Sequence, residues 1–89
     1  MTVKATREPP PYLPASYELA DASALQALAR GEATPEQQKR ALAWVMGKAA
    51  AVGEFEYRTD ARDHAFASGR RFVGLQVQKM IALNVGAFR

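Results

Sequence analysis

Two glycines interrupt a stretch of sequence that otherwise has the character of a helix. Gly69 and Gly74 lie within the apolar and basic segment of residues 65–75. Each glycine in a helix interior costs about 1 kcal/mol relative to alanine. A close approach of a second helix, where no side chain fits, is the simplest compensation for that cost. We therefore predict that both glycines are helix-packing positions in an all-α fold.

A chain of 89 residues without cysteine has few means of stabilising itself. A domain of this size buries only about 60% of the surface of its unfolded chain. No disulfide is available, and one histidine without cysteine argues against a zinc site. We expect neither a metal nor a cofactor. Association with other subunits is the remaining source of stability.

The net charge of +3 is a mild basic excess, and it lies in the second half of the chain. Residues 1–40 hold five basic and five acidic side chains, whereas residues 41–89 hold seven and four. A basic excess of this size is compatible with binding to an acidic protein surface. It is too small to indicate a dedicated nucleic-acid-binding patch. We see no apolar run of membrane-spanning length and no signal peptide, so we expect no membrane partner and a cytoplasmic location, or a particle assembled there.

Residues 1–15 are predicted to form an extended, proline-rich N-terminal arm. The prolines at 9–11 and Pro14 exclude helix and sheet and favour a polyproline conformation. Tyr12 and Leu13 are apolar residues within this arm. One interpretation is a disordered tail. The other is a strap that lays Tyr12 and Leu13 into a groove of a neighbouring subunit.

Residues 16–89 are predicted to form a small three-helix domain. The first helix lies within residues 15–30, where Asp21 or Ser23 can cap its start. Two leucines are spaced to face inward, and a glycine suits the left-handed stop. These residues are Leu25, Leu28 and Gly31.

The second helix has the clearest boundaries. Thr34 is its N-cap, Pro35 its first residue and Gln37 the partner in a capping box, and Gly53 ends it. One face carries an apolar stripe, predicted to be the core, and the other face is small and apolar, which indicates burial on both sides. The stripe is Leu42, Val45, Met46, Ala49 and Val52; the small face is Ala43, Gly47, Ala50 and Ala51.

Trp44 lies on the second helix between Arg40 and Lys48. It either folds over the edge of the core or serves as a buried anchor at an interface, where tryptophan is enriched. In the connector that follows, Phe55 and Tyr57 are expected to pack over the core.

The third helix is placed at residues 61–84, capped by Thr59 or Asp60. At 100° per residue, one of its faces is apolar and is predicted to be the core face. That face contains Phe66, Gly69, Val73, Val77, Met80 and Ile81.

The two arginines of this helix point in different directions. Arg70 falls inside the apolar face, so it must be paired with a carboxylate, either in its own subunit or across an interface. The candidates are Glu54, Glu56 and Asp63. Arg71 points the other way and is either solvated or in contact with an acidic partner or DNA phosphate. Leu75, on the same side, is either an ordinary exposed leucine or a partner contact.

No arrangement of residues indicates catalysis. His64 is the only histidine and has no partner at a catalytic spacing. Gly69 and Gly74 follow no strand, so they form no phosphate-binding loop. We predict no enzyme and no catalytic residue.

Residues 33–55 and 64–75 resemble a family of small structural proteins of tailed phages, typified by a structural protein of a short-tailed phage. The pattern of that family is a leucine-rich helix with a tryptophan, then glycine, an acidic or hydrophobic residue and phenylalanine, then Ala-Phe-x-x-Gly-Arg-Arg-x-Val-Gly-Leu. Residues 65–75 match the last block, and the likeness covers about residues 22–84. This chain departs from the pattern in its alanine-rich second helix.

The resemblance implies a non-enzymatic virion component in several copies at the portal, head-to-tail or tail region. Its partners would be portal, tail or adaptor proteins, its arrangement a ring, and its location the virion, assembled in the host cytoplasm. Partner-binding candidates are Tyr12, Leu13, Trp44, Arg70, Arg71 and Leu75. The alternative is a helical nucleic-acid-binding module that assists genome packaging, suggested by Arg70, Arg71 and Lys79.

Overall fold

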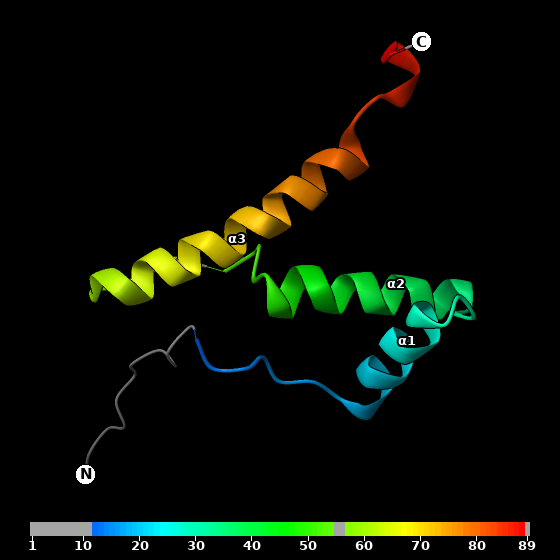
Figure 1. Cartoon of the computed structure of the whole chain (residues 1–89), viewed down its shortest axis with the longest axis horizontal. Helices are drawn as coiled ribbons and strands as arrows, with labels where there is room; N and C mark the ends of the chain where they lie inside the picture. The colour runs from blue at the N-terminus through cyan, green and yellow to red at the C-terminus, as the bar shows by residue number, and fades with distance from the viewer. Residues whose placement is uncertain (1–11, 55–56, 89) are drawn as a thin grey trace.

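The computed structural model describes residues 12–54 and 57–88, and these are helical without any strand (Figure 1). The all-α prediction is therefore confirmed. The helices are α1 (Leu19–Ala29), α2 (Pro35–Trp44), the π-helical segment η1 (Val45–Ala49), α3 (Ala61–Ala82) and the 3₁₀ turn η2 (Val85–Phe88). Residues 12–18 precede α1 without regular secondary structure, and residues 1–11 of the predicted arm lie outside the described residues.

Helix α1 begins one turn earlier than its expected caps. Glu18 is the N-cap, and the Asp21 carboxylate accepts the Glu18 backbone N–H at 2.8 Å. Asp21 thus supports the helix start from inside the first turn, and neither Asp21 nor Ser23 is the cap. Gly31 adopts a φ of 74°, the predicted left-handed stop.

Helix α2 begins as predicted. The Thr34 hydroxyl accepts the Gln37 backbone N–H at 3.1 Å, and the Gln37 side-chain oxygen accepts the Thr34 N–H at 2.9 Å. Pro35 occupies the first turn, where its missing N–H costs nothing. The expected end at Gly53 is wrong. The α-helix passes into a π-helical turn at Val45, and Ala51 takes the left-handed conformation with a φ of 53°.

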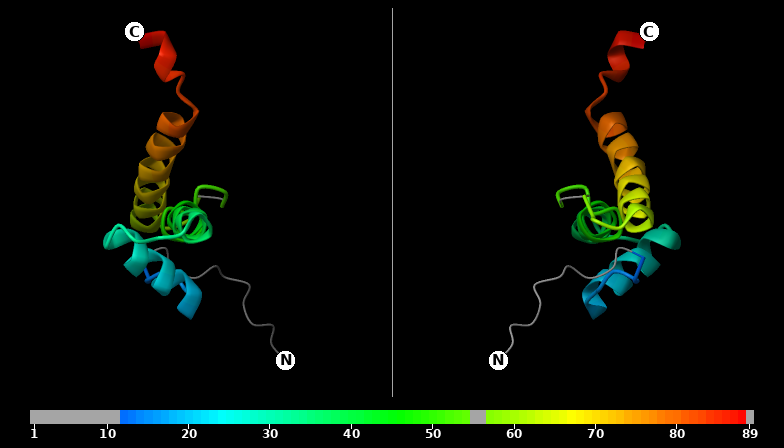
Figure 2. Two further views of the ribbon diagram at one scale, coloured as in Figure 1. Left: turned by 90° about the vertical axis from the view of Figure 1, so that its right-hand side faces the viewer. Right: turned by 90° about the vertical axis from the view of Figure 1, so that its left-hand side faces the viewer.

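The helices are arranged in three layers (Figures 1 and 2). Helix α2 lies in the middle, with α1 and the preceding extended segment on one side and α3 on the other. Helix α1 packs on α2, whereas α3 crosses the chain at η1. Within the described residues α1 and α3 do not touch. The helices therefore pack pairwise and enclose no common centre.

Small residues make these contacts. The buried apolar residues of the described chain are all alanines, and no large side chain there is fully buried. They are Ala24, Ala27, Ala41, Ala50, Ala51 and Ala67. Gly74 is buried with them in α3. Several predicted core residues are correspondingly out of place: Leu25 is only half-buried, and Leu28, Leu42 and Tyr57 are exposed. Phe55 lies outside the described residues.

Helix α3 has the expected Asp60 cap, whose carboxylate accepts the backbone N–H groups of Arg62 and Asp63. Its rotation about its own axis differs from the prediction by about 100°, roughly a quarter turn. Ala67 and Gly74 face the rest of the chain, while most of the predicted core face points outward. Phe66, Val73, Met80 and Ile81 are all exposed. The assumption that the apolar face must meet the chain's own core was wrong. Small residues face the rest of the chain instead, and Gly74 fits closely beside Ala50 and Val52.

Candidate protein interaction site

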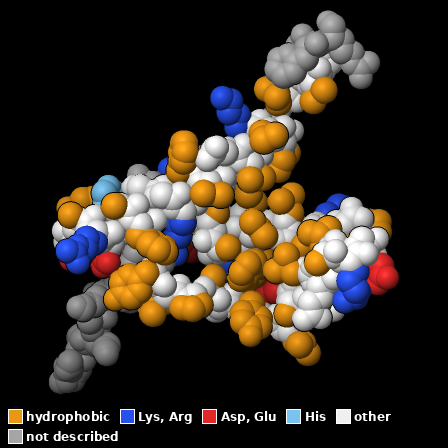
Figure 3. Space-filling view, in the orientation of Figure 1, with side chains coloured by type: hydrophobic (Ala, Val, Ile, Leu, Met, Phe, Trp, Pro, Cys, Tyr) orange, Lys and Arg blue, Asp and Glu red, His pale blue; other side chains and the backbone are white. Residues whose placement is uncertain are grey.

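The outward side of α3 carries a series of exposed apolar residues. We call it the outer face of α3 and define it by its exposed apolar residues Ala65, Phe66, Gly69, Phe72, Val73 and Met80. Met80 is 71% exposed and Val73 58% exposed. Hydrophobic side chains are visible along α3 in the space-filling view (Figure 3). An apolar surface that follows most of a 22-residue helix is typical of a protein interaction site.

Gly69 and Gly74 have different surroundings. A Cβ atom on Gly74 would overlap the side chains of Val52 and Ala50, so Gly74 lies where α3 meets the residues that directly follow η1. A Cβ atom on Gly69 would meet no atom of the described chain within 4 Å. Gly69 is therefore not a helix-packing contact within this part of the chain. It lies on the outer face of α3, where no described residue covers it.

A second apolar surface is formed by the extended segment and the start of α1. We call it the strap face and define it by Tyr12, Leu13, Tyr17 and Leu19. All four side chains are exposed, Tyr17 by 67% and Leu19 by 85%. The predicted partner residues Tyr12 and Leu13 are thus exposed, as are Tyr17 and Leu19, which the sequence analysis did not select.

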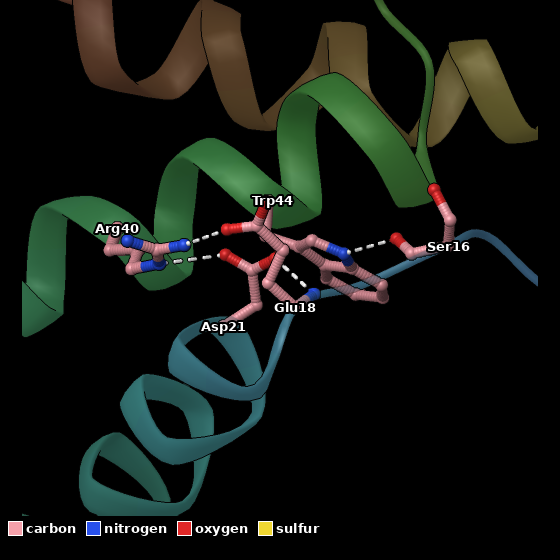
Figure 4. Close-up of polar contacts among 5 residues, drawn as sticks. All are labelled: Ser16, Glu18, Asp21, Arg40 and Trp44. Carbon is pink, nitrogen blue, oxygen red and sulfur yellow. Dashed lines mark hydrogen bonds and ion pairs between the residues drawn. The ribbon is translucent and has the colours of Figure 1, made fainter.

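Residues 12–18 are called the strap segment. Trp44 holds this segment against α2 (Figure 4). Its indole Nε1–H donates to the backbone oxygen of Ser16 at 2.9 Å, across 28 positions of sequence. The Trp44 side chain is half-buried. Trp44 therefore positions residues 12–18, a role that neither interpretation of this residue had included.

Arg40 fastens the start of α1 to α2 in the same region (Figure 4). Its guanidinium lies 2.8 Å from the Asp21 carboxylate and 2.9 Å from that of Glu18. The Glu18 backbone N–H, followed by the Arg40 guanidinium, lowers the pKa of Asp21 below its ordinary value. The Asp21 carboxylate in turn raises the pKa of Arg40. No signal in the sequence pairs these residues, because 19 or more positions separate them.

The arginine pair and Leu75 are all half-buried. The Arg71 Nε–H donates to the Val52 carbonyl at 3.0 Å, so Arg71 connects α3 to the chain that follows η1. The interpretation of Arg71 as a solvated side chain is wrong. Glu56, one of the carboxylates considered for Arg70, lies outside the described residues.

The ring of His64 packs against that of Tyr57 in a tilted arrangement, with centroids 5.5 Å apart and an interplanar angle of 58°. In residues 12–54 and 57–88 no cluster of three His, Asp or Glu side chains could hold a metal ion. Across that same part of the chain, no helix combines the length and apolar character needed to cross a bilayer. No family model, curated protein or solved structure matches this chain.

Proposed function

We propose that this chain is a non-enzymatic structural subunit of a bacteriophage virion, present in several copies in the portal, head-to-tail or tail region. The observation that carries the proposal is the outward orientation of the apolar face of α3. A subunit with alanines in its interior and large side chains outside is stabilised by what its neighbours cover. Repeated copies in a particle supply such neighbours.

The energetic reason is the cost of leaving this surface in water. Burial of one large apolar side chain contributes about 1.5–3 kcal/mol. Phe66, Phe72, Val73 and Met80 gain only part of this within the chain, since each stays exposed. An interface over the outer face of α3 would bury the remaining surface of these side chains. The free energy gained in this way would be large beside the total stability of a small domain.

Three further features support a role in a virion. The match of residues 65–75 to the Ala-Phe-x-x-Gly-Arg-Arg-x-Val-Gly-Leu block associates the chain with small phage structural proteins. A proline-rich N-terminal arm suits a strap between subunits, and residues 12–18 present Tyr12 and Leu13 outward. The basic α3 suits the acidic surface of a portal, tail or adaptor protein.

The nucleic-acid alternative has less support. Arg71, one of the three residues that suggested it, donates to a backbone carbonyl of its own chain. A phosphate-binding module must also lose affinity steeply as salt rises. Retention in a gel-shift assay at low salt, lost at high salt, would favour that alternative.

The test of the proposal is the protein content of purified particles. Mass spectrometry of gradient-purified virions from a phage that encodes this chain should detect its peptides at a multiple-copy ratio to the portal protein. Abundant chain in the infected-cell lysate together with its absence from the particles would contradict the proposal.

A further inference from the structure

The second helix, α2 together with η1, ends in a conformation that its own sequence disfavours. Residues 49–51 are three alanines, the residue type with the highest helix propensity, yet the α-helix gives way to the π turn before it reaches them. The Ala50 backbone N–H donates to the Val45 carbonyl at 2.8 Å, five positions back instead of four. Such a turn is rare and frequently lies at a functional site. Local preference therefore does not account for it.

Ala51 occupies a conformation that a nearby glycine would adopt more easily. Its φ of 53° lies in the left-handed region, which disfavours alanine by about five- to thirtyfold relative to the ordinary helix. Gly53, two residues further on, could take this conformation at no steric cost. The φ of Gly53 is not positive, and a Cβ atom there would meet nothing within 4 Å. The better stop signal is thus present in the sequence and is not used.

Contacts with α3 compensate for this unfavourable ending. The side chains of Ala50 and Val52 fill the space in which a Cβ atom of Gly74 would stand. The Arg71 Nε–H donates to the Val52 carbonyl at 3.0 Å. Both contacts depend on the π turn, because its removal would shift the residues after it by one position, about 100° around the helix axis. The docked position of α3 therefore selects the early stop.

We propose that the end of the second helix is a two-state switch controlled by the docking of α3. While α3 is docked, the helix ends through the π turn and left-handed Ala51. When α3 is released, residues 45–52 continue α2 as an uninterrupted α-helix, and Gly53 becomes its left-handed stop. Within the described residues α1 packs on α2 without touching α3, so release of α3 leaves the contacts of α1 in place. A molecule that binds only the released α3 shifts the population toward the long helix by its difference in affinity for the two states.

Carbon-13 NMR of Ala51 tests the switch, because its backbone chemical shifts distinguish a right-handed from a left-handed conformation. Gly74→Val blocks docking, since its side chain would overlap the residues that directly follow η1. Gly69→Val is the matched control, because it makes the same change on the same helix in open space. We expect Ala51 to be left-handed in the wild type and in Gly69→Val. In Gly74→Val we expect Ala51 to be helical and Gly53 to be left-handed.

Gly53→Ala identifies the stop of the long helix. On its own it should leave the Ala51 chemical shifts unchanged, because Gly53 has no positive φ in the docked state and lies in open space. Combined with Gly74→Val, it should lower the ratio of the helical to the non-helical form of Ala51 about five- to thirtyfold. If circular dichroism shows that Gly74→Val does not fold, Arg71→Met replaces it in both comparisons. That substitution removes the hydrogen bond to the Val52 carbonyl and should move the Ala51 shifts partway toward helical values.

Three results would overturn the proposal. The first is a left-handed Ala51 in the variant with α3 released, which would make the early stop a property of residues 45–52 alone. The second is a loss of helical chemical shifts throughout residues 45–52 in that variant, which would mean that release frays the helix instead of extending it. The third is a Gly53→Ala substitution that leaves the Ala51 equilibrium of the released variant unchanged.

Discussion

Gly74 lies so close to Ala50 that a Cβ atom added to the glycine would stand 2.7 Å from the Ala50 methyl group. Real Cβ atoms essentially never come nearer than 3.0 Å to another heavy atom. The side chain of Val52 occupies the same space. This contact limits how closely α3 approaches the residues that directly follow η1.

We expect Gly74→Ala to destabilise the protein by about 1–3 kcal/mol, the usual cost of an extra methyl group in a packed site. Gly69→Ala is the matched control, because it makes the same change on the same helix in open space. It should raise the free energy of unfolding by up to about 1 kcal/mol, since alanine is the better helix former. Urea unfolding followed by circular dichroism measures both. Equal effects of the two substitutions would show that α3 does not cross at Gly74.

Arg71 secures the same crossing through its hydrogen bond to the Val52 carbonyl. Arg71→Met keeps the apolar stem and removes the donor, leaving a carbonyl at a part-buried position without this partner. We expect a loss of about 1.5–3 kcal/mol, as for hydrogen bonds to charged groups. Lys79→Met, at an exposed position of the same helix, should change stability by no more than about 0.5 kcal/mol. A larger effect at Lys79 than at Arg71 would argue against the observed orientation of α3.

Three of the helix boundaries in this chain were predictable because their causes are local. The Thr34–Gln37 capping box, the Asp60 cap and the left-handed Gly31 each depend on residues within four positions of one another. The early end of the second helix was not predictable in this way. Val45 begins a π-helical turn, and Ala51 rather than a glycine takes the positive φ.

The packing faces were the part that sequence reasoning missed. Amphipathicity identifies which face of a helix is apolar, and it does not reveal whether the partner of that face is the same chain. In α3 the side that carries Ala67 and Gly74 packs against the rest of the chain, whereas Phe66 and Val73 stay exposed. The recurrence of alanine at buried positions such as Ala24, Ala27 and Ala41 was the available signal for close, small-residue packing.

Trp44 controls the position of the strap segment, and this can be tested in the isolated protein. Trp44→Phe keeps an aromatic ring and removes the hydrogen bond to the Ser16 carbonyl, a loss of about 1 kcal/mol. We expect chymotrypsin to cleave after Tyr17 faster in this variant, because the segment opens more often. Ser16→Ala is the control, since the acceptor is the backbone oxygen and remains in place. Faster cleavage in Ser16→Ala, or unchanged cleavage in Trp44→Phe, would contradict the role assigned to Trp44.

Asp21 gives the attachment of α1 to α2 a defined dependence on pH. The Glu18 N–H and the Arg40 guanidinium lower the pKa of Asp21 in the folded state below its unfolded value of about 3.9. The unfolded chain therefore binds more protons in the interval between the two values, and stability rises with pH there. The contribution of Asp21 is complete above the unfolded pKa and is lost as pH falls through the folded pKa. Thermal unfolding of the wild type and Asp21→Asn should thus differ by a constant amount from pH 8 to pH 5, and the difference should shrink below about pH 4. A difference that grows toward low pH would mean that Asp21 does not act as an ionised partner of Arg40.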